Sequence, residues 1–297
     1  MENNLYNLLR SRISIGTAQF GLDYGLGSKK KIELPEVKKI LNLCSKNNIT
    51  NIDTAFNYGN AHQVLSNAPL EKFQITSKVS SKFLDQDFEV IENNISETIR
   101  ILGINRFENL LTHDSQIFFE SKKRSINNLI LLKEKGYTNS IGISIYEEKE
   151  AIKAASFFLP DIIQIPFNPL DQRLLDSEFI LNLVHSGTKI QARSIFLQGL
   201  ILTNKIPPSL PENTSIIMDK IEKFCNDHKI SKLDFCLIFI AKNLSLLNSV
   251  VLGVDSFNNL KEIIDSTKRI NGNKFGGNNF KIFKSRDLSI IDPRFWK

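Results

Sequence analysis

The sequence is poor in cysteine and has no long hydrophobic segment. Its three cysteines, Cys44, Cys225 and Cys236, form no CxxC pair and have no histidine at ligand spacing, which argues against a disulfide framework or a zinc site. Each lies in an apolar helical context, so we expect buried thiols and no metal. The longest apolar run, near 235–241, is far shorter than the ~20 residues that span a bilayer. The N-terminus lacks the apolar core of a signal peptide. From these absences we expect a protein located in the reducing cytoplasm, without a membrane partner.

A large excess of one charge is lacking as well. The 38 basic and 32 acidic side chains leave a net charge of +6, which does not require a nucleic-acid partner. Basic runs at 29–31 and 122–124 come without a zinc, helix-turn-helix or RNA-recognition signature, so they predict solvated surface. Hydrophobic residues make up 41% and charged ones 24%, which is close to the average for globular proteins and excludes disorder, collagen and coiled coil as whole-chain descriptions.

No Pro/Gly/Ser-rich linker divides the chain, and apolar strand-like runs alternate with helical patterns throughout. The predicted strands cover 12–16, 49–53, 73–79, 109–113, 140–144, 162–165, 189–193 and 249–253. The predicted helices between and after them cover 35–46, 88–102, 123–135, 147–157, 174–185, 213–228 and 256–268. Such alternation predicts parallel strands joined by right-handed crossovers.

Eight units of this kind predict an α/β fold, a single (β/α)₈ TIM barrel. A Rossmann fingerprint is lacking, since the glycines at 21–27 have the wrong spacing. We expect one domain over 1–297, with the barrel core at about 12–268 and a C-terminal extension at 269–297. The first eleven residues, a second helix at 231–246 and the loop at 194–211 are accessories to the repeat. The extension begins with a polar stretch at 271–279 that we expect to be flexible.

Four titratable residues of different types lie at or after the ends of three neighbouring strands: Asp53, Tyr58, Lys78 and His113. In a barrel these ends meet at the catalytic face. Singly, each has an ordinary structural explanation; together they predict a site that delivers a proton to a carbonyl oxygen. Tyr58 would be the acid, with the Lys78 ammonium lowering its pKa and Asp53 keeping that ammonium charged. His113 would orient the substrate oxygen. Since none of the four can donate hydride, a nicotinamide cofactor must supply it.

The sequence resembles the aldo-keto reductase superfamily. The matching strings are GTAQFG at 16–21, DTAFNYG at 53–59, SK at 77–78, LTHD at 111–114, GIS at 142–144, QIPFN at 164–168 and VLG at 251–253. They occur in order from about 12 to 268, which makes the match more specific than any single motif. The resemblance implies an NAD(P)(H)-dependent oxidoreductase with Asp53, Tyr58, Lys78 and His113 as catalytic tetrad.

The resemblance also implies a cofactor site. Ser144 and Gln164 would hold the nicotinamide carboxamide, and the segment from Gly253 to Ser256 would face the adenosine phosphates at a helix start. The expected cofactor-binding residues are Gly16, Thr17, Ser144, Gln164, Arg193, Ser194, Gly253, Val254, Ser256 and Asn259. NADP(H) is favoured by the family, and Asp255, which would repel a 2′-phosphate, leaves NAD(H) open.

Arg193 and His62 are among the positions that depart from the family pattern. Arg193 stands where many members stack an aromatic ring on the nicotinamide; a guanidinium can also stack or contact phosphate, and a structural salt bridge is the alternative. His62 replaces a common glutamate, and we expect it not to be catalytic.

The predicted substrate is a small-molecule carbonyl compound. Phe20, Tyr24, Phe56 and Phe167 are candidates for its pocket, with packing in the core as the equal alternative. The ending DPRFWK at 292–297 is loosely similar to those of bacterial members linked to surface-polysaccharide biosynthesis, which suggests a sugar or sugar-derived carbonyl. A second hypothesis is a nicotinamide-binding regulatory protein on the same fold with little turnover.

Overall fold

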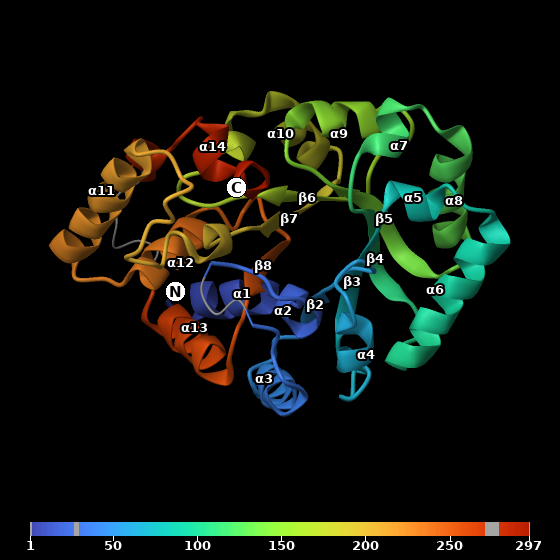
Figure 1. The fold of residues 1–297 in the computed structure, drawn as a ribbon, viewed down its shortest axis with the longest axis horizontal. Coiled ribbons are helices and arrows are strands. Elements are labelled where there is room, and N and C mark those ends of the chain that lie inside the picture. The colour runs from blue at the N-terminus through green and yellow to red at the C-terminus, as the bar shows by residue number, and fades with distance from the viewer. Residues whose placement is uncertain (1, 27–29, 271–278, 297) are drawn as a thin grey trace.

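Eight parallel strands close into a barrel in a computed structural model that describes residues 2–26, 30–270 and 279–296 (Figure 1). Each strand pairs with the next along the chain, and β8 pairs with β1. The strands are β1 (Ile13–Gly16), β2 (Asn51–Asp53), β3 (Gln74–Val79), β4 (Phe107–Thr112), β5 (Thr138–Ser144), β6 (Ile162–Pro166), β7 (Lys189–Arg193) and β8 (Ser249–Gly253). The predicted TIM barrel is confirmed.

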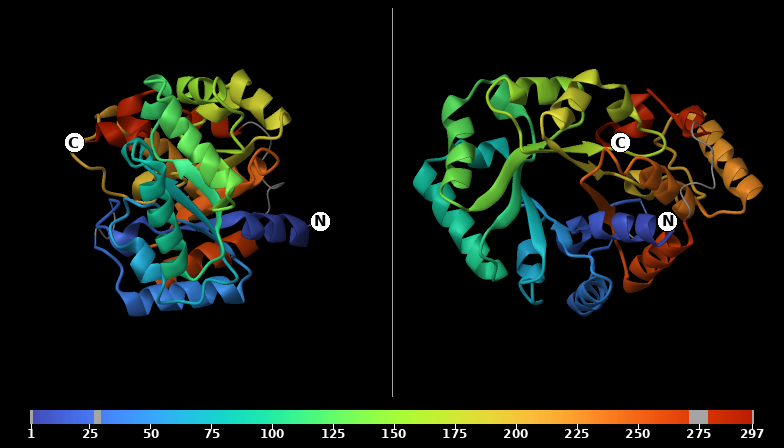
Figure 2. Two further views of the ribbon diagram at one scale, coloured as in Figure 1. Left: turned by 90° about the vertical axis from the view of Figure 1, so that its right-hand side faces the viewer. Right: turned by 180° about the vertical axis from the view of Figure 1, so that it is seen from behind.

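The helices lie outside the strands, as the two further views show (Figure 2). The longer ones are α1 (Glu2–Arg12), α3 (Leu34–Lys46), α6 (Phe88–Leu102), α8 (Lys123–Glu134), α9 (Glu148–Ala155), α10 (Glu178–His185), α11 (Asn213–His228), α12 (Lys232–Lys242) and α13 (Phe257–Arg269). Apolar side chains on one face of each pack inward, for example Val37, Ile40, Leu41 and Cys44 of α3. This one-sided pattern is what made the helices visible in the sequence.

The predicted helix at 174–185 is shorter than expected. Residues Arg173–Asp176 form a separate 3₁₀ turn, η1, and α10 begins only at Glu178. The Ser177 hydroxyl accepts a hydrogen bond from the Ile180 amide at 3.0 Å, so it caps a new helix and interrupts the old one. The short helices α2 (Ala18–Gly21), α5 (Ser81–Leu84) and α7 (Gln116–Phe119) were also not predicted, and a further short helix, α4 (Ala61–Leu65), contains His62.

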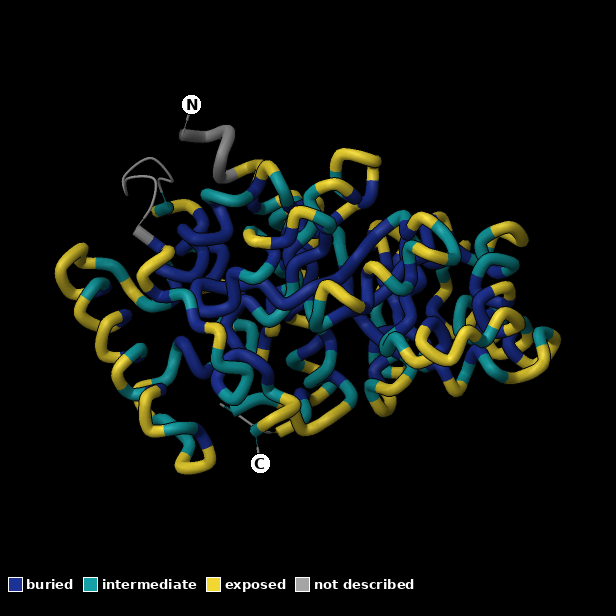
Figure 3. The backbone as a smooth tube through the Cα atoms, turned by 90° about the horizontal axis from the view of Figure 1, so that it is seen from above, coloured by how far each residue is buried: buried dark blue, intermediate teal, exposed yellow. Residues whose placement is uncertain are grey.

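Helix α12 is an accessory to the repeat and is buried on nearly every side. Its run from Phe235 to Ala241 is wholly buried, because α11, α13 and the C-terminal segment cover it. Figure 3 shows this continuous buried interior beneath a surface of exposed turns. No helix among the described residues is both long and apolar enough to cross a membrane.

The C-terminal segment returns to the barrel in three short turns, η3 (Asn279–Phe283), α14 (Leu288–Ile291) and η4 (Pro293–Phe295). The Phe280 and Phe283 rings lie 5.1 and 5.0 Å from the Phe235 ring of α12, centroid to centroid. In Figure 1 α14 lies near α10. The segment is therefore packed against the barrel over its described length. The expected flexible stretch falls mostly on 271–278, outside the described residues.

Candidate active site

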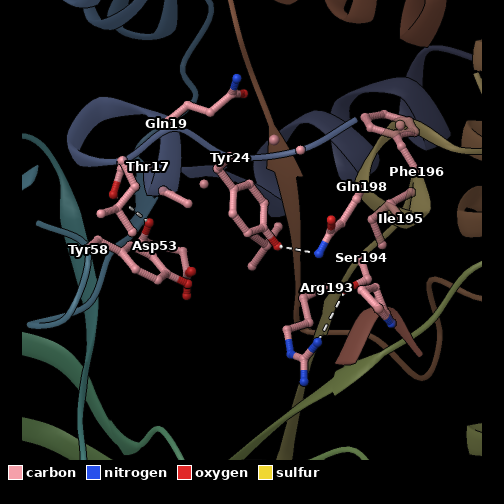
Figure 4. A pocket seen from close by; sticks show the side chains of 18 of the residues that line it. Thr17, Gln19, Tyr24, Asp53, Tyr58, Arg193, Ser194, Ile195, Phe196 and Gln198 are labelled. Carbon is pink, nitrogen blue, oxygen red and sulfur yellow. Dashed lines mark hydrogen bonds between the residues drawn. The ribbon is translucent and has the colours of Figure 1, made fainter. Parts of the chain in front are cut away.

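A cavity of about 490 Å³ lies at the C-terminal ends of the strands. This volume is within the usual range for sites that bind small molecules. Figure 4 shows part of its wall, with Tyr24 beside Gln198 and with Tyr58 and Arg193 to either side. The cavity is lined by residues from both ends of the chain, among them Gly16, Thr17, Asp53, Asn57, Tyr58, His113, Ser144, Gln164, Gly253, Pro293 and Arg294.

Asp53 and Lys78 form a buried ion pair at the floor of this cavity. The Lys78 ammonium donates to Asp53 Oδ1 at 2.6 Å and to the Thr54 carbonyl at 2.9 Å. Strands β2 and β3 are paired neighbours. Asp53 is the last residue of β2 and Lys78 the penultimate residue of β3, so their side chains come together. Burial lowers the pKa of Lys78, and Asp53 opposes that effect.

Tyr58 is held in the loop between β2 and α4. Its ring centroid is 5.1 Å from Lys78 Nζ and 5.7 Å from the His113 ring. The loop is fixed by a close approach to α2, because a Cβ on Gly21 would meet the Tyr58 carbonyl oxygen at 1.8 Å. The structure thus brings the four predicted residues together. Asp53, Tyr58 and His113 line the cavity, and Lys78 lies beneath its lining, bonded to Asp53.

The pKa of Tyr58 differs from the sequence-based expectation. Burial raises it, and the Asp53 carboxylate adds to the rise, while Arg193 opposes it. The lowering expected from Lys78 is outweighed by burial and by the Asp53 carboxylate, with which that ammonium is paired. Tyr58 consequently keeps its proton at neutral pH.

His113 is neutral at physiological pH. Burial lowers its pKa to about 4, with further lowering by Lys78 and Arg193. Its Nδ1 atom is buried without a hydrogen-bond partner among the described residues. A neutral imidazole in this position can donate or accept a hydrogen bond without carrying charge.

Gln164 of β6 connects Asp53 of the tetrad to Ser144 on β5 and Gln191 on β7 through hydrogen bonds. Its amide nitrogen donates to Asp53 Oδ2 and to Gln191 Oε1, both at 2.7 Å, and its oxygen accepts from the Ser144 hydroxyl at 3.2 Å. Gln191 was not predicted as a site residue. It lies two residues before Arg193 on β7 and pairs in register with Gln164, so strand alternation was the signal that could have found it.

Most of the residues expected to bind a cofactor line the cavity. They are Gly16, Thr17, Ser144, Gln164, Arg193, Ser194, Gly253 and Asn259. Val254 is buried and does not line it. Ser256 instead caps α13, accepting from the Asn259 amide at 3.1 Å, and the Phe257 amide of the same helix donates to Glu36. Two of the amides that were expected to face phosphate therefore already have partners.

Of the four aromatic residues proposed for the substrate pocket, only Tyr24 lines the cavity. Phe20 and Phe167 are fully buried in the core, the latter 4.8 Å from the Phe239 ring. Phe56 packs against Phe83 and His62. These three follow the alternative of core packing, since none of them lines the cavity.

His62 lies next to strand β3, which carries Lys78. Its Nε2 is 3.3 Å from the Ser77 hydroxyl, and burial together with Lys78 lowers its pKa to about 4. It does not line the cavity.

Two residues that the sequence did not single out form the wall opposite Tyr58. The Tyr146 ring centroid lies 4.1 Å from the Arg193 guanidinium carbon and 3.6 Å from that of Arg294. Tyr146 comes two residues after Ser144, so it was within reach of strand alternation. Arg294 comes from η4, and no local pattern connects it to β5.

Residues 12–271 match the profile of the Aldo/keto reductase family. The holo form of the aldo-keto reductase AKR11C1 from Bacillus halodurans superposes with a TM-score of 0.73 at 13% identity, covering 96% of this chain and 95% of that one. A thermostable aldo-keto reductase, Tm1743, in complex with the inhibitor epalrestat, gives a TM-score of 0.66 at 19% identity, with coverages of 92% and 93%. No curated protein matches significantly.

Proposed function

Because the chain belongs to the aldo/keto reductase family, we propose that it is an NAD(P)H-dependent reductase of aldehydes or ketones in which Tyr58 donates the proton. The observation that carries the proposal is the arrangement of Tyr58 and His113 on a cavity whose floor holds the Asp53–Lys78 pair. Family membership supports carbonyl reduction, and the tetrad names the residues that would perform it.

The residues on the cavity wall fit a nicotinamide cofactor. Gly253 leaves open space, since no atom lies within 4 Å of the point that a Cβ would occupy. Ser144, Gln164 and Asn259 also line the cavity, and the Gln164 oxygen, which accepts from Ser144, has a second lone pair for a ligand donor. A nicotinamide bound there would supply the hydride. NADPH remains the proposed cofactor by family, with NADH open because Asp255 lines the cavity.

Each member of the tetrad has one task in this proposal. Tyr58 holds a proton at neutral pH and releases it to the developing alkoxide. Lys78, kept charged by Asp53, lies near enough to stabilise the resulting tyrosinate. His113 is neutral, so it can hydrogen-bond the substrate oxygen without competing for the proton. Gln164 acts on Asp53 and keeps that carboxylate in place.

The substrate is proposed to be a polar carbonyl compound, such as a sugar or a sugar derivative. Tyr24, Asn57, Tyr146 and Gln198 supply hydroxyl and amide groups to the cavity wall. Burial and the neighbouring Tyr58 and Tyr146 raise the pKa of Tyr24 to about 12, so its hydroxyl stays neutral and can hydrogen-bond a hydroxylated substrate.

The test compares the wild type with Tyr58→Phe on a panel of aldehydes and sugars, with NADPH and NADH in parallel. We expect kcat to fall by about 10²- to 10⁴-fold, the usual contribution of a general acid, and the Kd of the cofactor to stay within about twofold. Unchanged turnover in the variant would remove Tyr58 from the mechanism. Tight cofactor binding by the wild type without turnover of any carbonyl would favour the regulatory alternative.

A further inference from the structure

The wall opposite Tyr58 carries two guanidinium groups that the tetrad does not use. Arg193 ends β7 and Arg294 lies in η4, and both pack on the ring of Tyr146. All three side chains line the same cavity as Tyr58 and His113. We call these three residues the arginine wall.

Arg193 has no acidic partner within the described part of the chain. Its hydrogen bonds go to neutral oxygens, the Ser194 hydroxyl at 3.2 Å and the Ile145 carbonyl at 3.1 Å. The acidic residues that line the cavity are Asp53 and Asp255; the first is paired with Lys78 and the second accepts from the Ser256 hydroxyl. The charge of Arg193, which is also among the expected cofactor-binding residues, is therefore left for a bound ligand to balance.

Arg294 is held in place by the carboxylate of Asp292, which accepts hydrogen bonds from no other side chain among the described residues. Asp292 is fully buried, and it accepts from Arg294 Nη2 at 2.6 Å, from Nε at 3.0 Å and from the Arg294 amide at 3.0 Å. Within the described residues Nη1 makes no hydrogen bond, and 45% of the Arg294 side chain is exposed. Asp292 therefore caps η4 and at the same time fixes the Arg294 side chain before a ligand binds.

The origin of Arg294 separates it from the cofactor site. The family match ends at residue 271, and the wall and floor residues assigned to cofactor and tetrad all precede that point. Arg294 follows it, on a segment anchored by Phe280 and Phe283. Arg294 therefore lies outside the region that the family members share. Members of a family differ in the substrates they bind, so a side chain contributed from outside that region is suited to substrate recognition.

We propose that the arginine wall binds an oxyanion of the substrate, so that the carbonyl compound reduced here carries a carboxylate or a phosphate. The inference rests on the proposed function and deepens it. A guanidinium offers paired N–H donors that match either oxyanion, and Arg294 is already oriented before the ligand arrives, which limits the entropic cost of binding.

Two matched pairs of aldehydes test the proposal and distinguish the anions. Glyceraldehyde is compared with glyceraldehyde 3-phosphate, and 4-nitrobenzaldehyde with 4-carboxybenzaldehyde. For the wild type we expect kcat/KM of the anionic member of at least one pair to exceed that of its neutral partner by about tenfold or more. Equal values in both pairs would overturn the proposal, while turnover of the neutral aldehydes would leave the proposed function standing.

Variants assign the preference to Arg294. Arg294→Gln should lower kcat/KM for the preferred anion by about 10- to 100-fold, change the neutral partner by less than threefold, and leave the cofactor Kd unchanged. Since this variant leaves Asp292 unpaired, the double variant Asp292→Asn/Arg294→Gln provides a neutral replacement and should show the same loss of preference. Arg100→Gln, on the exposed face of α6, is the control for a general change in charge. Equal losses for anionic and neutral aldehydes would contradict the assignment.

A binding measurement covers the case in which no aldehyde is turned over, which would count against the proposed function itself. The chain has one tryptophan, Trp296, two residues after Arg294. We expect its fluorescence to change saturably with inorganic phosphate or succinate at constant ionic strength, and the Arg294→Gln variant to lose this response. No saturable change with either anion would overturn the inference.

Discussion

Lys78 carries its charge in a place that water does not reach. Its side chain is 1% exposed and that of Asp53 is 4% exposed, so each ion depends on the other for stabilisation. A buried ion pair stabilises the folded state little more than a well-packed apolar pair would. Removing one partner, however, lowers the stability strongly, because the other partner is left buried and charged. For Asp53, Gln164 supplies only one neutral hydrogen bond in compensation.

We therefore expect Lys78→Met to lower the free energy of unfolding by about 3–5 kcal/mol, measured by urea denaturation. The double variant Asp53→Asn/Lys78→Met should recover a large part of this loss, although neither variant should reduce carbonyls. Lys39→Met, which breaks an exposed pair with Glu36 on α3, should cost about 0–1 kcal/mol. A cost for Lys78→Met no larger than that of the surface variant would show that the pair is not buried in solution.

At the scale of the element, the start of α13 is surrounded by acceptors. Ser256 and Glu36 accept from its first amides, and Asp255 lines the cavity just before it. The basic residues at its other end are engaged there, Lys268 with Asp265 and Arg269 with Asp234. A 2′-phosphate near this helix start would meet the Asp255 carboxylate, and the first basic residue along α13 is Lys261, one turn into the helix.

Asp255→Asn should consequently tighten NADPH by about 3- to 10-fold, since a unit charge at contact distance is worth about 1 kcal/mol in water, and change NADH by less than twofold. Parallel fluorescence titrations measure both constants. Asp265→Asn, on the exposed face of the same helix, is the matched control. If NADH and NADPH tighten equally, Asp255 does not face the 2′ position.

The elements themselves were largely visible in the sequence. All eight strands and the long amphipathic helices were predicted because burial on one side imposes a period that local composition reveals. The helix at 174–185 was predicted too long. The apolar periodicity continues across Ser177, so the pattern alone did not show that this serine caps a new helix. Four residues of the site were found through the rule that strand ends converge. Arg294 was not, because its approach to Tyr146 joins segments far apart in the sequence.

At the scale of the whole molecule, two partly buried histidines couple stability to pH. The folded-state pKa values of His62 and His113 are about 4, below the value near 6.5 expected in the unfolded chain. The unfolded chain then binds more protons between these values. Stability is full above about pH 6.5 and falls as the pH drops towards 4.

His62→Gln should reduce this dependence, because one of the two groups is removed. Each histidine contributes a slope of up to about 1.4 kcal/mol per pH unit, which urea denaturation at pH 7, 6 and 5 can resolve. His185→Gln, at the exposed end of α10, should keep the wild-type slope. Identical slopes in the wild type and His62→Gln would mean that His62 is not buried in the neutral form.

The order in which the chain is made has a consequence for the arginine wall. All eight strands leave the ribosome before residues 279–296, which carry Arg294. A nascent barrel can therefore close while its cavity still lacks one side. Recognition of an anionic ligand through Arg294 begins only when this segment has docked on α12, so a ligand held by that residue cannot assist the earlier steps of folding.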